Sequence, residues 1–255
     1  MTDIFQLSVY MSFIAFTVLG VLFFLFGRLV LYVLARHAKH HPLSIPNGAF
    51  ISTIATAWAL SLGFVAADIW TVGATADQAT SDERSAIARL IGTAKSPVIN
   101  APELLDALIL YRTAVIDDEW TENINLRPVP AVETALQNIR NEIFAIGQSD
   151  IPAPIIMHLL NDFDILQNSR NMRLAVGTTS VDAYKWYLVL SLTMMTIMTI
   201  ASTHADRIRA GSMALFIFSF SATLCLWLLA IHANPYQGLE KLEPTLLLTE
   251  SESQT

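Results

Sequence analysis

The chain contains little of what usually marks a soluble enzyme or a secreted domain. Only 15% of its 255 residues are charged, against about 25% in soluble domains. Its one cysteine, Cys225, cannot form an intrachain disulfide, and we interpret it as a buried thiol. The sequence has no phosphate-binding loop, nucleophile elbow or paired metal ligands, so we predict no enzyme activity, no cofactor and no metal site. The net charge of −7 is unsuited to nucleic acid, which requires basic patches.

Charge is missing altogether from four long stretches. Each is long enough to span a bilayer, because about 18 or more apolar residues suffice for a helix to cross the hydrocarbon core. Inside lipid the backbone must satisfy its own hydrogen bonds, which favours helices over open strands. We therefore predict an all-α integral membrane protein with four transmembrane helices and a helical soluble insert between spans two and three. The charge-free stretches are 4–27, 42–67, 186–203 and 210–231.

The predicted organisation assigns 1–70 to spans one and two, 71–184 to the insert, 185–232 to spans three and four, and 233–255 to an acidic tail. Proline and glycine break the insert into helices. Asn100, followed by Pro102, is a start signal for one of them. No strong breaker follows span two, so its helix is expected to continue to about Lys95. The other expected insert helices are 131–146 and 155–176.

Basic residues predict the orientation in the membrane. The connection between spans one and two carries Arg28, Arg36 and Lys39, and that between spans three and four carries Arg207 and Arg209. Lys and Arg in short loops mark the cytoplasmic side. We therefore expect a bacterial inner (plasma) membrane protein whose termini and insert face the periplasmic or outer side.

Span two is the candidate pore helix. Small, weakly polar residues recur on it at helical spacing, and this face fits either close helix packing or a pore. In the pore interpretation the adjoining Leu60 and Phe64 would form a constriction that dewets when closed. The small residues are Ser52, Thr56, Ala59, Gly63 and Ala67.

Acidic residues near this span allow two interpretations. Asp68 is either an ordinary interfacial residue or, repeated around an oligomer, a cation-attracting mouth. Trp70 fits an interfacial anchor, because its amphipathic ring prefers the headgroup level. Between residues 71 and 184 there are 15 acidic and 8 basic residues. This excess is either a solvated acidic surface or a vestibule that concentrates cations.

Several short motifs occur in order along nearly the whole chain. They comprise the segment 40–44, a tryptophan-flanked end of span two, an acidic segment after it, an acidic-Trp element in the insert, and a Pro-aromatic element after the last span. The ordered set resembles the bestrophin-like family of bacterial membrane proteins. The motif positions that carry the resemblance are Trp70, Glu83, Glu119, Trp120, Asn234, Pro235, Tyr236 and Gly238.

The resemblance implies a relationship to bestrophins, which are pentameric ion channels gated at a narrow apolar neck. The residues after Gly238 have too few clustered carboxylates for the calcium site of animal bestrophins, so that site is not carried over. The predicted outward insert is also opposite to the cytoplasmic insert of true bestrophins. We expect a homo-oligomer, a pentamer by resemblance, that passes small ions. The alternative is a non-conducting membrane scaffold or accessory subunit whose helical insert docks another protein.

Overall fold

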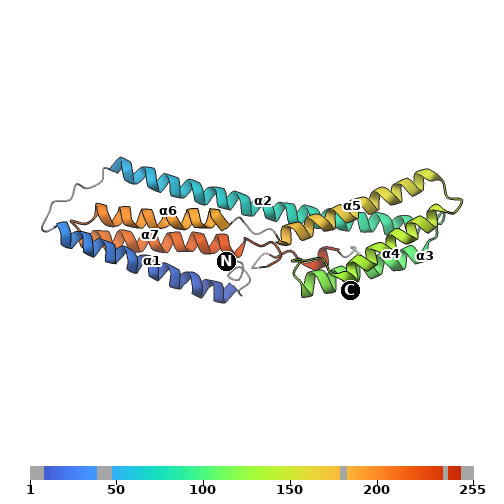
Figure 1. The fold of residues 1–255 in the computed structure, drawn as a ribbon, viewed down its shortest axis with the longest axis horizontal. Helices are drawn as coiled ribbons and strands as arrows, with labels where there is room; N and C mark the ends of the chain where they lie inside the picture. Colours follow the sequence, from blue (N-terminus) through green and yellow to red (C-terminus); the bar gives the residue numbers. More distant parts are fainter. Residues whose placement is uncertain (1–8, 39–47, 179–182, 238–240, 248–255) are drawn as a thin grey trace. The chain divides into compact units, whose positions relative to one another are not determined.

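The computed structural model describes residues 9–38, 48–178, 183–237 and 241–247 (Figure 1). Within these ranges the ordered elements are all helical, which confirms the predicted all-α class. Four of the helices are long and apolar enough to cross a membrane, as predicted. The elements are α1 (Val9–Ala38), α2 (Gly48–Ala94), α3 (Pro102–Ala114), the π-helix η2 (Val115–Glu122), α4 (Pro130–Gly147), α5 (Ala153–Thr178), α6 (Ala183–Thr203), α7 (Ile208–Ile231) and the 3₁₀-helix η3 (Pro244–Leu247).

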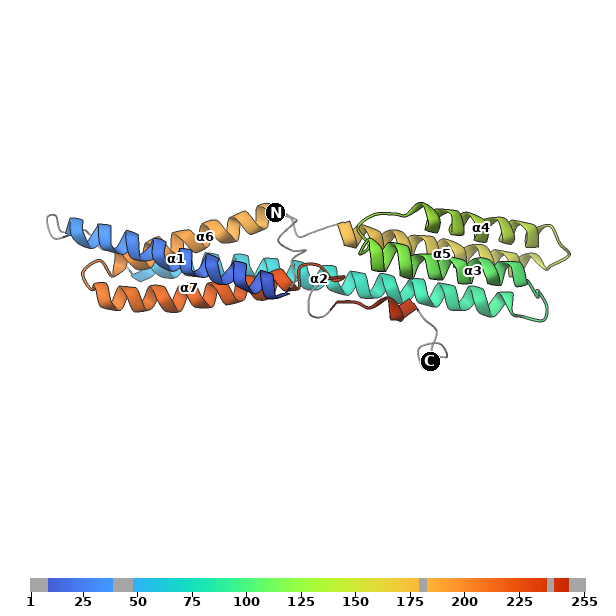
Figure 2. The same cartoon turned by 90° about the horizontal axis from the view of Figure 1, so that it is seen from below.

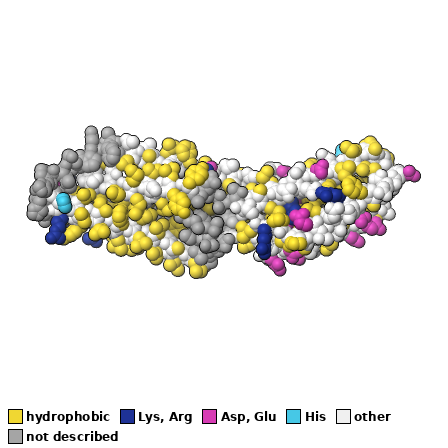
Figure 3. Space-filling view, in the orientation of Figure 1, with side chains coloured by type: hydrophobic (Ala, Val, Ile, Leu, Met, Phe, Trp, Pro, Cys, Tyr) yellow, Lys and Arg dark blue, Asp and Glu magenta, His cyan; other side chains and the backbone are white. Residues whose placement is uncertain are grey.

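The chain divides into two compact units. Unit 1 comprises residues 1–71 and 180–234, and unit 2 comprises residues 72–179 and 235–255. The helix α2 contributes to both units, and it ends at Ala94, close to the predicted Lys95. In Figure 3 hydrophobic side chains cover most of the visible surface of unit 1, whereas acidic side chains are frequent over unit 2. These surfaces suit lipid for unit 1 and water for unit 2.

Unit 1 is a bundle in which α1 packs against α7 and α6, and α6 packs against α7. In Figure 1 α6 and α7 lie between α1 and α2. The α2 helix is attached through Trp58, whose Nε1 donates to Thr193 Oγ1 at 2.9 Å and whose ring lies edge-on to Phe218. The core of the unit is apolar and includes Leu31, Val65, Ile69, Ile197 and Leu215.

A glycine allows the close approach of α1 to its neighbours. A Cβ on Gly27 would lie 2.8 Å from Leu215 Cδ2 and 2.9 Å from Ile197 Cγ2. Small residues have this role in membrane helix pairs, where packing replaces the hydrophobic effect as the source of association.

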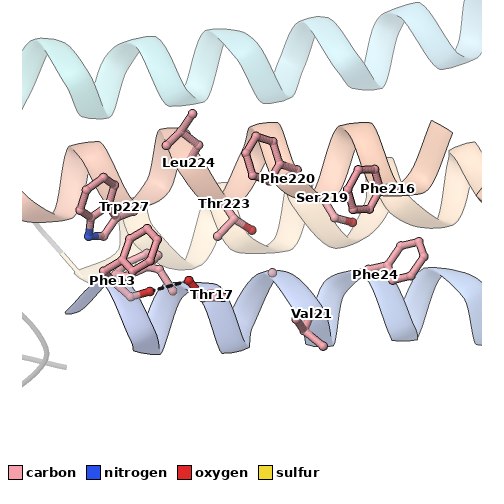
Figure 4. A pocket seen from close by; sticks show the side chains of 12 residues that line it. Phe13, Thr17, Val21, Phe24, Phe216, Ser219, Phe220, Thr223, Leu224 and Trp227 are labelled. Atoms are coloured by element: carbon pink, nitrogen blue, oxygen red, sulfur yellow. Dashed lines mark hydrogen bonds between the residues drawn. The ribbon is translucent and has the colours of Figure 1, made fainter. Parts of the chain in front are cut away.

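An apolar cavity of about 250 Å³ lies between α1 and α7 (Figure 4). Phe13 and Trp227 meet edge-on at one end of it, and Phe24 and Phe216 at the other. Thr17, which also lines the cavity, donates its hydroxyl to the carbonyl of Phe13. The lining is mostly apolar and carries no charged side chain; its polar groups are the hydroxyls of Thr17, Ser219 and Thr223.

The helices of unit 2 are the second part of α2, α3, η2, α4, α5 and the short η3. Of these, α2, α3, α4 and α5 run side by side (Figure 2). The buried face of each helix is largely apolar; Leu90, Leu108, Ile139 and Leu166 are examples with no exposed surface. Proline occupies the first turn of α3 and of α4, where its missing N–H costs nothing.

Three details differ from or add to the sequence-based expectations. Asn100 does not cap α3; the N-cap residue is Ala101, and Asn100 has a left-handed backbone with φ 42°. The insert helix that begins at Pro102 is not α-helical throughout, because it changes at Val115 from α to π. The segment predicted as an acidic tail also contributes two residues, Tyr236 and Leu247, to the apolar core of unit 2.

Candidate functional site

The predicted pore residues lie on one exposed face of α2 within unit 1, which we call the α2 stripe. Leu60 and Phe64 are 57% and 62% exposed, and a Cβ built at Gly63 would meet no described atom within 4 Å. Exposed positions recur every three or four residues, the spacing of one helix face. The stripe comprises Ser52, Thr56, Ala59, Leu60, Gly63, Phe64 and Ala67.

The opposite face of the same segment is packed. Val65 is 1% exposed and Ile69 is 3% exposed, and both belong to the apolar core of unit 1. In a single chain, α2 is thus attached through one face while the small and weakly polar face is left outward. The structure brings the predicted pore residues together, except that Asp68 lies at the edge of the stripe.

Asp68 forms an ion pair that the sequence analysis did not predict. Lys185 at the start of α6 places its Nζ 2.5 Å from Asp68 Oδ2. The Asp68 side chain is 38% exposed and the Lys185 side chain is 29% exposed, so the pair is reached by solvent or headgroups. Trp70, two residues further along α2, is 72% exposed. Its exposed ring is compatible with the predicted interfacial anchor.

Four of the family-motif positions, Glu83, Glu119, Trp120 and Tyr236, lie at a different place, in the interior of unit 2. Glu83 comes from α2, Glu119 from η2, and Arg170 and Arg173 from successive turns of α5. Glu83, Glu119 and Arg173 have no exposed surface, and Arg170 is 2% exposed. We call these four residues the Glu–Arg network.

Each arginine of the network is bound by carboxylates. Arg173 donates to Glu83 Oε2 at 2.7 Å through Nε and to Glu119 Oε2 at 3.0 Å through Nη2. Arg170 donates to Glu119 through Nε and Nη2, and to Glu133 Oε1 at 2.9 Å. Two buried cations therefore pair with two buried anions. Such pairing is needed because a charge removed from water is costly unless it has a partner.

Neutral groups complete the coordination of the carboxylates. Tyr111 donates its hydroxyl to Glu83 Oε1 at 2.7 Å. The backbone N–H of Val129 donates to Glu119 Oε1 at 3.2 Å. Burial, reinforced by the negative charge of Glu83, raises the pKa of Tyr111 well above its ordinary value. Burial opposes the charge on Arg173, but Glu83, Tyr111 and Glu119 together outweigh it, and the pKa of Arg173 is raised.

A tight backbone approach closes the network. Asn125, with φ 56°, accepts a hydrogen bond from Arg173 through its side-chain oxygen. Gly177 lies against the Asn125 backbone, and a Cβ at Gly177 would be only 2.0 Å from the Asn125 carbonyl oxygen. Only glycine fits this position without a backbone shift.

Two aromatic motif residues connect the network to the segment after α7. The guanidinium carbon of Arg173 lies 5.4 Å from the centroid of the Trp120 ring, and the same ring is edge-on to Tyr236. Tyr236 donates its hydroxyl to the Arg173 carbonyl at 3.2 Å, and Trp120 Nε1 donates to the Leu242 carbonyl at 3.3 Å. Asn234 and Pro235 precede these contacts, whereas Gly238 lies outside the described residues.

The sequence-based predictions did not include Arg170, Arg173 or Lys185 as partners of the acidic residues. Arg170 and Arg173 lie three residues apart, which places them on one face of a helix. That face also carries the buried Leu166 and Phe163. Two cations on an apolar helix face are a usable signal for buried acidic partners.

In the described part of the chain no three His, Cys, Asp or Glu residues are arranged to hold a metal.

Comparison with known proteins agrees with this architecture. A family model described as the Bestrophin-like domain matches residues 14–247. Two crystal structures of point variants of a bacterial bestrophin homologue from Klebsiella pneumoniae share the fold, each with 13% sequence identity. The match to the first has a TM-score of 0.68 and covers 89% of this chain and 96% of that chain. The match to the second has a TM-score of 0.66 and covers 89% of this chain and 94% of that chain. No curated protein matches the chain.

Proposed function

We infer that this chain, which belongs to the Bestrophin-like family, is a subunit of a homo-oligomeric channel that conducts small ions past the α2 stripe. The family relationship supports five copies around the path, by resemblance. In this proposal the copies are arranged with their α2 stripes toward a common axis.

The exposed α2 stripe is the observation that carries the proposal. A helix in lipid gains nothing by turning small, weakly polar residues such as Thr56 and Gly63 toward acyl chains, because lipid tails are themselves apolar. The same residues suit a crowded axis, where small side chains let backbones approach and hydroxyls meet water or ions. Since the opposite face of α2 is buried in unit 1, the stripe is the part of α2 left for such an axis.

The two bulky members of the stripe are the proposed gate. Leu60 and Phe64 are exposed and lie one helical turn apart, between the small residues. A ring of such side chains can close a narrow pore by excluding water rather than by a physical plug.

The Glu–Arg network is assigned a structural role in this proposal. Its four charged groups are buried and already paired, so they offer nothing to a passing ion. They fix α2, η2 and α5 of unit 2 to each other, and thereby the part of α2 that follows the spanning segment.

Electrical recording of the purified full-length protein in planar bilayers tests the channel. We expect discrete currents, and we expect Leu60→Ala or Phe64→Ala to increase the open fraction because a smaller side chain leaves room for water. Leu228→Ala is the matched control: Leu228 is 44% exposed but lies on α7, away from the stripe. Equal effects of Leu60→Ala and Leu228→Ala would contradict the assigned gate.

A measurement of native mass separates the channel from its rival. A closed homo-oligomer supports the channel. Silence across voltage, pH and divalent cations, together with a monomer or a constant foreign partner, would favour a scaffold or accessory subunit whose insert docks another protein.

A further inference from the structure

Lys185 is a positive charge beside the α2 stripe, and nothing in the sequence pattern marked it as part of a pore. It lies at the start of α6, and its ammonium pairs with the carboxylate of Asp68 at 2.5 Å. It also lies 5.8 Å from the centroid of the Tyr184 ring, a favourable position for a cation. The ring contact lies within α6, and the ion pair with Asp68 connects Lys185 to α2.

The position of Asp68 places this pair next to the proposed ion path. Asp68 follows the stripe residue Phe64 by four positions, which is about 6 Å along the helix axis. It lies between the exposed stripe and the buried face of α2, and 38% of its side chain is exposed. Charges at such a boundary act across about 8–10 Å at physiological ionic strength.

The pair changes the electrostatics that Asp68 alone would produce. A ring of unpaired Asp68 carboxylates would present one negative charge per subunit and favour cations. With Lys185 beside each carboxylate, every subunit contributes one positive and one negative charge. The mouth of the path is then close to neutral, and small changes at either residue alter its sign.

We propose that Lys185 is a selectivity-determining residue that balances Asp68 at one end of the α2 stripe, so that the pair sets the preference between cations and anions. The inference rests on the proposed channel function. It goes beyond that proposal because it assigns ion discrimination to a residue on α6 rather than on the pore helix.

The two single substitutions are expected to act in opposite directions. Lys185→Gln leaves one negative charge per subunit and raises the cation-over-anion permeability ratio roughly two- to tenfold, as expected for several charges acting at about 10 Å through water. Asp68→Asn leaves one positive charge and lowers the ratio by a similar factor. The reversal potential in a potassium chloride gradient across a planar bilayer measures both changes.

Three further variants separate charge from structure. The double variant Asp68→Asn/Lys185→Gln is neutral, and we expect its reversal potential to return close to that of the wild type. Lys185→Arg keeps the charge and is expected to leave the reversal potential unchanged. Arg207→Gln removes an exposed cation in the connection between α6 and α7 and is expected to have no more than a minor effect.

The salt dependence adds a measurement that a purely structural pair would not alter. At about 1 M salt the screening length falls to about 3 Å, so the effects of both single variants should shrink. If the pair only fastens α2 to α6, both single variants would change open probability in the same direction, the reversal potential would stay fixed, and the double variant would be no better than the singles. That outcome would overturn the inference while the currents uphold the channel. Absence of any current in the wild type would instead overturn the proposed function.

Discussion

The two units of this molecule place their charges in opposite ways. Unit 1, which is built for lipid, has an apolar core, and its one described ion pair between spanning helices, Asp68–Lys185, is partly exposed. Unit 2, which has the acidic surface, encloses two glutamates and two arginines that are at most 2% exposed. Whether a unit is surrounded by lipid or by water therefore does not decide whether its charged side chains are buried. The network of unit 2 is tolerated because every charged group in it has a partner.

Under the proposed function, the contrast separates residues that hold the protein together from residues that would line the ion path. The family-motif residues Glu83, Glu119, Trp120 and Tyr236 all lie in or against the Glu–Arg network. The α2 stripe, by comparison, is an exposed face of its helix rather than part of a packed interior. Substitutions in the two regions should accordingly affect different measurements: stability for the network and ion flow for the stripe.

Removing one cation from the network should have the largest effect. Arg173→Met leaves Glu83 and Glu119 buried without their shared partner, and breaking a buried pair in this way costs about 3–5 kcal/mol. Thermal unfolding of the purified protein, followed by near-UV circular dichroism, measures the loss. Arg89→Met is the control, since the Arg89–Asp162 pair is exposed on one side and is worth about 0–1 kcal/mol. Equal losses for both variants would show that the network is not a stability centre.

Removing the tyrosine hydroxyl should have the next largest effect, and one that depends on pH. Tyr111→Phe deprives the Glu83 carboxylate of a donor, at a cost of about 1.5–3 kcal/mol. In the wild type the raised pKa of Tyr111 means that the unfolded chain releases this proton near pH 10.0, whereas the folded chain retains it. Stability should therefore fall as pH rises above about 10, and fall less steeply in Tyr111→Phe. Tyr187→Phe, at an exposed ring, is the control for the loss of a tyrosine hydroxyl and should cost much less stability.

A pair of glycines compares packing in the two units. Gly177→Ala brings a methyl group against the Asn125 carbonyl and should cost about 1–3 kcal/mol through a forced backbone shift. Gly63→Ala enters open space on the α2 stripe and should not destabilise the isolated subunit. Instead it should alter single-channel conductance, because it adds a methyl group beside the proposed path. Gly177→Ala should therefore lower the unfolding midpoint without changing the conductance. Gly63→Ala should change the conductance without lowering the unfolding midpoint.

The smallest change concerns the segment after α7. Tyr236→Phe removes the hydrogen bond to the Arg173 carbonyl and keeps the ring against Trp120, so the cost should be about 0.5–1.5 kcal/mol. Hydrogen exchange of residues 241–247 should rise modestly. No change in exchange would show that the ring contact alone holds this segment.

Local sequence patterns predicted the helices but not their long-range contacts. Uncharged runs and proline breaks are properties of neighbouring residues, so the spans and the insert helices could be located from them. The network joins residues as far apart as Glu83 and Arg173, and no local period connects them. The π-helix at Val115–Glu122 was also not foreseen, because the apolar spacing there reads as an ordinary helix. The same limit concealed the partner of Asp68.

Cysteine accessibility along α2 is the most direct test of the account. In a Cys225→Ser background, which removes the only native thiol, single cysteines replace Thr56, Gly63 and Ala67 on the stripe and Val65 and Ile69 on the buried face. Currents are recorded while a charged, thiol-reactive methanethiosulfonate is added. We predict rapid block at the three stripe positions and none at the two buried ones. Block without this periodicity, or modification of the stripe without any change in current, would contradict the claim that the α2 stripe lines the ion path.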